Sequence, residues 1–201
     1  MYNVCLIISY KGSFFYGFQS QPHQRTVYDE VVSILSSIYK DPVSCSFSGR
    51  TDKGVHAAQQ YMNFKTDQFI PVDGLFKALS SLLPIDIECH SVQYVSLSFD
   101  ARFSAESREY RYRFSSDDRV PIFLREFVLS IQKFDIDQVD SLGNLLLGTH
   151  DFKGFSCAGS PSKTTIRTLY HFSTHKKEIL DLVNSASYRY YEVVIIGNSF
   201  L

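Results

Sequence analysis

Tryptophan is absent from this chain of 201 residues, and it holds only two methionines and four cysteines. No apolar run approaches the roughly 18 residues of a membrane-spanning helix, so we expect no membrane segment. The cysteines lie far apart and form no Cys-x-x-Cys pair, which argues against a zinc site of the usual spacing and against dense disulfide bonding. The first residues also lack the basic stretch of a signal peptide. We therefore expect a cytoplasmic protein with reduced thiols.

An excess of basic charge is also missing. The net charge is −1, so the overall balance indicates no nucleic-acid partner. Arginine is concentrated in one segment: four arginines lie among Phe and Tyr residues between positions 102 and 113. Aromatic residues make up 15% of the chain, but most of them should be core, so abundance alone does not indicate base stacking.

Three common catalytic and nucleotide-binding motifs do not occur. The chain has no Gly-x-x-x-x-Gly-Lys-Ser/Thr loop, no Gly-x-Gly-x-x-Gly fingerprint and no Gly-x-Ser-x-Gly elbow. Their absence removes the usual signals for a phosphate-binding loop, a dinucleotide site and a hydrolase nucleophile.

The first half of the chain predicts a βαββαβ order. Residues 4–10 form an apolar run that is typical of a strand buried on both faces. Apolar residues at helical spacing follow Thr26, a suitable N-cap, and recur between Pro71 and Pro84. Further strands are expected at 43–48, 59–65 and within 85–95. This order is that of a ferredoxin-like unit.

The second half begins in the same way. Strands are expected at 107–115, 166–174 and 187–196, and a helix at 135–147. The segment 178–183 has no clear pattern. The order βαββ indicates a second ferredoxin-like unit that ends one helix and one strand short; a complete but asymmetric domain is the alternative. We expect an α+β protein with units at 1–97 and 98–201.

A polar loop between two predicted strands carries the strongest candidate for chemistry. Gly49 and Gly54 bracket Arg50, Thr51, Asp52 and Lys53, and glycine permits positive φ or close backbone approach. The two flanking cations favour an ionised Asp52, as a nucleophilic carboxylate requires. A plain turn with solvated charges is the alternative, and residue chemistry alone leaves both open. His56 has no second metal-ligand pair nearby, so we expect no metal.

The segment from Gly49 to Ala57, Gly-Arg-Thr-Asp-Lys-Gly-Val-His-Ala, resembles the signature of the tRNA pseudouridine synthase A (TruA) family. Further matches are spread along the chain, at 10–12 and 16–21 (with Phe18 in place of the usual Trp), 99–105, 108–112, 148–152 with Phe155, and 165–167. The resemblance implies the pseudouridine synthase fold, in which two ferredoxin-like units form one extended, mixed but mainly antiparallel sheet.

The resemblance also implies a reaction and its residues. Members of the family isomerise uridine to pseudouridine at positions 38 to 40 of the tRNA anticodon stem-loop, without cofactor or metal. Asp52 would be the catalytic aspartate, acting on either the base or the ribose. Tyr110 would stack on the uracil, Arg167 would pair with the catalytic aspartate, and Arg50 would support the site. The remaining candidates for RNA contact are Lys53, His56, Arg102, Arg108, Arg111 and Lys163.

The resemblance implies a homodimer that binds tRNA. It also implies a further C-terminal helix beyond Leu201, so we expect a fragment or truncated product whose activity is weak or absent. A non-catalytic tRNA-binding protein or a truncated inactive homologue is the alternative function.

Overall fold

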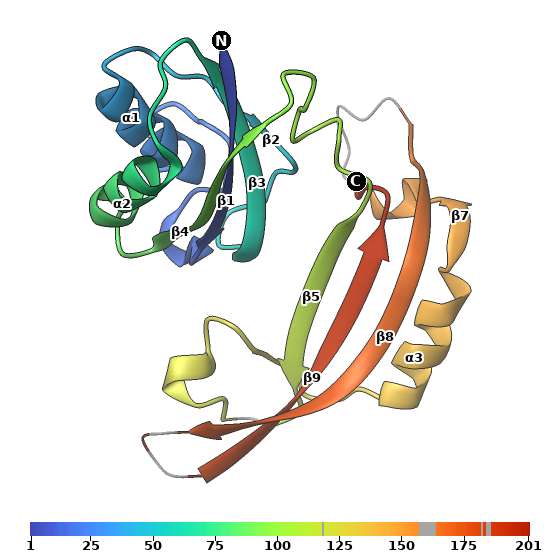
Figure 1. The fold of residues 1–201 in the computed structure, drawn as a ribbon. Helices are drawn as coiled ribbons and strands as arrows, with labels where there is room; N and C mark the ends of the chain where they lie inside the picture. Colours follow the sequence, from blue (N-terminus) through green and yellow to red (C-terminus); the bar gives the residue numbers. More distant parts are fainter. Residues whose placement is uncertain (118, 157–163, 182, 184–185) are drawn as a thin grey trace. The chain divides into compact units, whose positions relative to one another are not determined.

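The computed structural model describes residues 1–117, 119–156, 164–181, 183 and 186–201. The chain divides into two compact units, Met1–Ala105 (unit 1) and Glu106–Leu201 (unit 2), each with its own sheet (Figure 1). The α+β class and the mainly antiparallel pairing are confirmed. The single extended sheet is not found among these residues. After unit 1's last strand, the chain turns, and its backbone bonds to side chains instead of to a strand.

Unit 1 confirms the predicted βαββαβ order. Its elements are β1 (Tyr2–Tyr10), α1 (Val27–Tyr39), β2 (Ser46–Phe47), β3 (Ala57–Thr66), α2 (Val72–Leu82) and β4 (Ile87–Val95), with a short 3-10 helix at Gly12–Phe14. The sheet order is β2-β3-β1-β4. The ferredoxin-like pairing therefore places the central strand β1 against both β3 and β4, antiparallel to each. The second predicted strand is much shorter than 43–48, since only two of its residues pair with β3.

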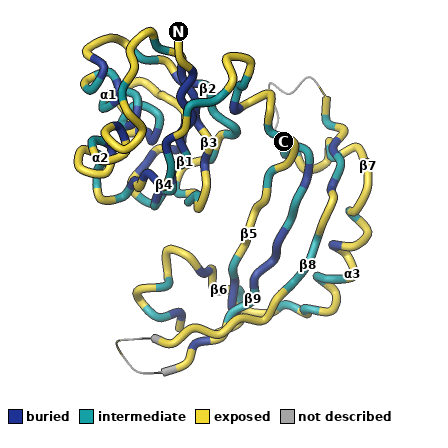
Figure 2. The backbone as a smooth tube through the Cα atoms, in the orientation of Figure 1, coloured by how far each residue is buried: buried dark blue, intermediate teal, exposed yellow. Residues whose placement is uncertain are grey.

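The core of unit 1 lies between its sheet and its two helices, which cover the same side of the sheet (Figure 1). Thr26 caps α1 as predicted, because its Oγ1 accepts a hydrogen bond of 3.2 Å from the Asp29 N–H. Val31 and Leu35 are fully buried on the inner face of α1, and Leu6 is fully buried on β1. Figure 2 shows this burial concentrated in the strands and inner helix faces. Each such side chain contributes about 1.5–3 kcal/mol through burial.

A polar network fixes the chain after β4. Asn3 donates from Nδ2 to the carbonyl oxygens of Ser96 and Phe99, and Asn63 accepts from the Ala101 N–H at 2.8 Å. Asp100 lies in this segment, partly buried. Burial alone would raise the pKa of Asp100, but hydrogen bonds from the Ser46 hydroxyl and neighbouring backbone N–H groups outweigh it and lower that pKa below 3.8.

Unit 2 has a five-stranded sheet in the order β6-β5-β9-β8-β7. Its elements are β5 (Arg108–Ser115), β6 (Leu129–Ser130), α3 (Ile136–Leu145), β7 (Gly148–Asp151), β8 (Ile166–Asp181) and β9 (Ala186–Gly197), with 3-10 helices at Ile122–Leu124 and Lys153–Phe155. The predicted strand–helix–strand–strand order is confirmed by β5, α3, β8 and β9, and β9 pairs with β5 as β3 pairs with β1.

Two parts of unit 2 differ from the expectation. The strands β6 and β7 were not predicted, because segments of two and four residues are too short to show a hydrophobic period. Strand β8 continues to Asp181, since residues 176–181 pair with 186–191 in a long hairpin that extends past the end of β5 (Figure 1). None of the helices in the described ranges is both long and apolar enough to cross a membrane.

Candidate active site

The loop between β2 and β3, residues 48–56, is held in place by the end of β1, by the segment that follows it and by β3. The hydroxyl groups of Tyr10 and Thr51 share a hydrogen bond of 2.8 Å, and the Phe18 N–H donates to the Thr51 carbonyl oxygen at 3.0 Å. Gln60 donates from Nε2 to the carbonyl oxygen of Gly49. Asp52 therefore follows a residue that is bonded through both its side chain and its backbone.

Glycine is needed where the two segments touch. The Gly12 N–H donates to Nδ1 of His56 at 3.1 Å, and a Cβ on Gly12 would lie 2.1 Å from the Val55 carbonyl oxygen. Gly17 adopts φ +95°, and a Cβ there would lie 2.9 Å from the Thr51 carbonyl oxygen. His56, proposed from the sequence as an RNA contact, thus ties the loop to the segment after β1.

Of the two glycines that bracket the loop, only Gly54 has the backbone conformation that the sequence suggested. Gly54 adopts φ +82°, as expected of a glycine in a sharp turn, and the Val55 N–H closes this turn on the Asp52 carbonyl oxygen at 3.1 Å. Gly49 is not among the positive-φ residues of the described chain, and apart from its chain neighbours no described atom lies within 4 Å of where its Cβ would be. The expectation for Gly49 is wrong in this respect.

An aromatic cluster lies beneath the loop. Phe18 is fully buried, and its ring centroid lies 4.8 Å from that of Phe47 and 6.0 Å from that of Tyr10. Tyr28 completes the cluster at 6.3 Å. Phe18 therefore fills a core position directly below the residues that carry Thr51 and Asp52.

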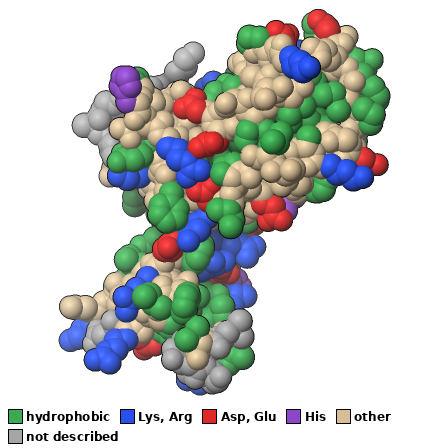
Figure 3. Space-filling model, turned by 90° about the vertical axis from the view of Figure 1, so that its left-hand side faces the viewer, with side chains coloured by type: hydrophobic (Ala, Val, Ile, Leu, Met, Phe, Trp, Pro, Cys, Tyr) green, Lys and Arg blue, Asp and Glu red, His purple; other side chains and the backbone are tan. Residues whose placement is uncertain are grey.

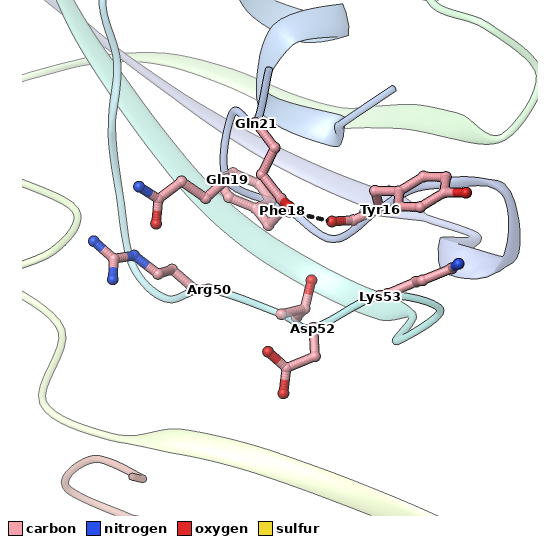
Figure 4. Close-up of a pocket in the computed structure, with 8 residues that line it drawn as sticks. Tyr16, Phe18, Gln19, Gln21, Arg50, Asp52 and Lys53 are labelled. Atoms are coloured by element: carbon pink, nitrogen blue, oxygen red, sulfur yellow. Dashed lines mark hydrogen bonds between the residues drawn. The ribbon is translucent and has the colours of Figure 1, made fainter. Parts of the chain in front are cut away.

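A pocket lies on the outer side of the loop, lined by Tyr16, Phe18, Gln19, Gln21 and residues 50–53 (Figure 4). The exposed Asp52 carboxylate extends away from Gln19 and Gln21, and the ammonium of Lys53 lies beside Tyr16. Arg50 extends in another direction. Within the part of the chain that the structure describes, neither cation forms an ion pair with Asp52. The prediction that both cations act directly on the carboxylate is not supported by this geometry.

The remaining predicted site residues belong to unit 2, apart from Arg102. Tyr110 on β5 is 38% exposed and meets the ring of Phe200 edge-on at 4.7 Å. Arg167 at the start of β8 is buried, and its Nη1 donates to the carbonyl oxygens of Thr164 and Ile166. Because paired residues of antiparallel strands share a face, the register places Tyr110 and Arg167 on one face of the second sheet.

Two of the side chains predicted to contact RNA are bonded to other groups of the protein. Arg108 donates to the Asn198 carbonyl oxygen at 2.7 Å. Arg111 pairs with Glu109 at 2.6 Å, a hydrogen bond that raises the pKa of the guanidinium. Arg102 is exposed and lies 5.3 Å from the Phe103 ring centroid. Lys163 lies outside the described residues.

On the face that Figure 3 shows, charged side chains lie among other kinds. Figure 3 shows Lys and Arg side chains on one face of the molecule, interspersed with hydrophobic and acidic ones. In the described ranges, no group of three or more His, Cys, Asp or Glu residues is placed to hold a metal ion.

Sequence reasoning missed the support of the loop. Tyr10 was placed in the first predicted strand, Gly12 and Gly17 in the loop after it, and all three in a family motif, but their contacts with the loop were not expected. A glycine directly after a strand is a signal for close backbone approach, but sequence alone does not say which segment approaches.

Known proteins are similar to this chain over most of its length. A family model described as tRNA pseudouridine synthase matches residues 144–201. The tRNA pseudouridine synthase A of Bacillus pumilus is 40% identical over 166 residues, which cover 81% of this chain and 67% of that protein. The proteins of the same name from Caldicellulosiruptor bescii and Halalkalibacterium halodurans are each 34% identical, covering 93% and 100% of this chain and 78% of each relative. The chain therefore belongs to the tRNA pseudouridine synthase A family.

Proposed function

We propose that this chain isomerises uridine to pseudouridine in tRNA, with Asp52 as the nucleophile and no metal or cofactor. The observation that carries the proposal is the presentation of Asp52: an exposed carboxylate on a loop whose neighbouring residues are fixed by hydrogen bonds from two other segments. The relatives' name, tRNA pseudouridine synthase A, supports the reaction and the substrate class. The finer target, positions 38 to 40 of the anticodon stem-loop, comes from the resemblance.

The reaction exchanges one glycosidic bond for another. The bond from N1 to C1′ breaks, the uracil turns, and C5 joins C1′. C5 then gives up its proton to water and N1 takes up a proton, so the product is an isomer of uridine and the hydrogen at C5 is released. A carboxylate must be ionised to act as the nucleophile in this sequence. An exposed position supports that state, because water solvates the charge before RNA arrives.

A base within a stem must leave the stack before it reacts, at a cost of a few kcal/mol. We propose that Tyr110 offsets part of this cost as a stacking platform, since stacking on an aromatic side chain contributes about 1–3 kcal/mol per base. We propose that Arg167 supports the charge of the catalytic carboxylate, as the resemblance implies. The exposed Arg50 and Arg102 are our first candidates for phosphate contacts, which position RNA without reading its sequence.

The test is tritium release from tRNA that carries uridine labelled at C5. The resemblance implied weak or absent activity for a truncated product; under this proposal the wild-type chain releases tritium, and Asp52→Asn loses roughly 10⁴-fold or more in rate, as removal of a nucleophile does elsewhere. The matched control is Asp41→Asn, which neutralises an exposed carboxylate beyond the end of α1 and should leave the rate unchanged. Stem-loops with a single uridine at position 38, 39 or 40 identify the target.

Two results would contradict the proposal. A wild-type chain that binds tRNA but forms no pseudouridine would favour the alternative of a non-catalytic tRNA-binding protein. An active Asp52→Asn variant would show that the nucleophile lies elsewhere. We also propose a cytoplasmic homodimer, and light scattering of the chain with and without tRNA tests the assembly.

A further inference from the structure

The segment after β1 exposes two aromatic rings beside the loop that carries Asp52. Phe15 is buried, whereas its neighbours Phe14 and Tyr16 are 63% and 43% exposed. Phe15 has extended backbone angles, φ −112° and ψ 143°, so side chains on either side of it point outward while its own points into the core. The folding of unit 1 accounts for the burial of Phe15, but it does not account for the exposure of Phe14 and Tyr16.

Each exposed ring has a lysine beside it. The Lys53 ammonium lies 4.0 Å from the centroid of the Tyr16 ring, and the Lys11 ammonium lies 5.6 Å from that of Phe14. Both distances fall within the range of about 6 Å for a cation–π contact. Lys53 directly follows Asp52 in the chain, and Tyr16 lines the same pocket as both residues.

Tyr16 is a fixed platform. Its N–H donates to the Arg25 carbonyl oxygen at 2.9 Å, and its own carbonyl oxygen accepts from Nε2 of Gln21 at 2.6 Å. Gly17 then contacts the Asp52 loop directly. A ring on an anchored backbone loses little conformational freedom when a ligand stacks on it, which lowers the cost of binding.

An exposed ring with an exposed cation beside it matches the chemistry of an unpaired nucleotide, which has a planar base and an anionic phosphate. Grooves that bind single-stranded nucleic acid combine these two features. We propose that Tyr16 and Lys53, with Phe14 at the edge, form a subsite for an unpaired nucleotide of the RNA, next to the uridine on which Asp52 acts. The base stacks on Tyr16, and Lys53 moves from the ring to a phosphate. This inference rests on the proposed function.

The test measures binding separately from turnover. Every variant is placed in the Asp52→Asn background, and its affinity for an anticodon stem-loop RNA is measured. We expect Tyr16→Leu to weaken binding about tenfold, equivalent to about 1.4 kcal/mol, and Tyr16→Phe to bind like the parent. Lys53→Met should reduce the slope of log K against log salt by about 0.7, the value for one contact with single-stranded phosphate. Phe76→Ala, at an exposed ring on α2, is the control and should change neither quantity.

Stacking is read directly with 2-aminopurine placed beside the target uridine. Binding to the parent and to Tyr16→Phe should quench its fluorescence, and binding to Tyr16→Leu should not. Equal affinity and equal quenching in Tyr16→Leu and the parent would overturn the subsite, even where the wild-type chain forms pseudouridine. Failure of the wild-type chain to bind the RNA would overturn both the subsite and the proposed function. Failure of turnover alone would overturn only the function.

Discussion

Gly12→Ala is the sharpest structural test of the Asp52 loop. A Cβ on residue 12 would lie 2.1 Å from the Val55 carbonyl oxygen, 2.5 Å from the Val55 carbonyl carbon and 2.9 Å from that of Gly54. Close carbon–oxygen contacts in proteins are about 3.3 Å or longer. The two main-chain segments must therefore separate by more than about 1 Å, because backbone atoms, unlike a flexible side chain, cannot rotate away.

The displacement should reach Asp52. The Gly12 N–H bond to His56, now 3.1 Å, would lengthen beyond hydrogen-bond range. Val55 closes a turn on Asp52, so movement of Val55 carries the aspartate with it. A misplacement of 1 Å costs about 100-fold in rate, and we expect that loss in kcat with little change in KM. Overpacking should also lower the free energy of unfolding by about 1–3 kcal/mol.

Single-turnover tritium release at saturating tRNA measures the rate, and urea unfolding measures the stability. Gly49→Ala is the control within the loop, because no described atom lies within 4 Å of its Cβ position. Gly74→Ala is the control on α2, where the nearest atom is Ile70 Cγ2 at 3.9 Å, and it should stabilise the helix by about 0.5–1 kcal/mol. A folded Gly12→Ala variant with wild-type kcat, or equal damage from Gly49→Ala, would refute the reasoning.

Three further predictions follow from the structure of unit 1. Tyr10→Phe removes the 2.8 Å hydrogen bond to Thr51. Because one such bond contributes about 0.5–1.5 kcal/mol net, the variant should lower kcat about threefold to tenfold at unchanged KM. A wild-type kcat would argue against a positioning role for Tyr10. Because the pKa of Asp100 lies below 3.8, its contribution to stability is complete above pH 3.8 and is lost as the pH falls through the lowered pKa. Asp100→Asn should therefore destabilise by roughly 1–3 kcal/mol at pH 7 and by less in acid, as measured by urea unfolding across pH; a constant difference would contradict this. Burial raises the pKa of Cys45 to about 12 and that of Cys89 to about 11. Thiol reagents at pH 8 should therefore label neither cysteine in the folded protein, as measured by peptide mapping. Labelling of the folded protein would show that this region opens locally.

The elements with long hydrophobic periods were predictable from the sequence. The helices α1 and α2 bury residues at helical spacing, and β1 reads as a continuous apolar run, so local pattern and tertiary burial agree. The helix α3 was predictable from its apolar spacing alone, because Leu142 and Leu145 are exposed in unit 2 and Gly143 is its buried residue. The short strands β2, β6 and β7 were not, since two to four residues gain their structure from the neighbouring strand and show no pattern of their own.

The loop motif was predictable as a turn and its support was not. Gly54 has the positive φ that a glycine in a sharp turn suggests. The contacts of Gly12 with Val55 and of Tyr10 with Thr51 join residues more than forty positions apart. Such pairs depend on how β1 and β3 align, and one sequence contains no record of that register.

The two cations next to Asp52 in the sequence do not lie next to its carboxylate in space. Arg50 and Lys53 flank the carboxylate in the chain, yet they extend in different directions, and Lys53 lies over the Tyr16 ring instead. In unit 1 the Asp52 carboxylate is exposed, so water can solvate it. Binding of RNA would remove that water and bring further negative charge, so a cation from outside the loop becomes necessary in the complex. The geometry of the loop sets this requirement without naming the cation; Arg167 is our candidate because the family resemblance implies it.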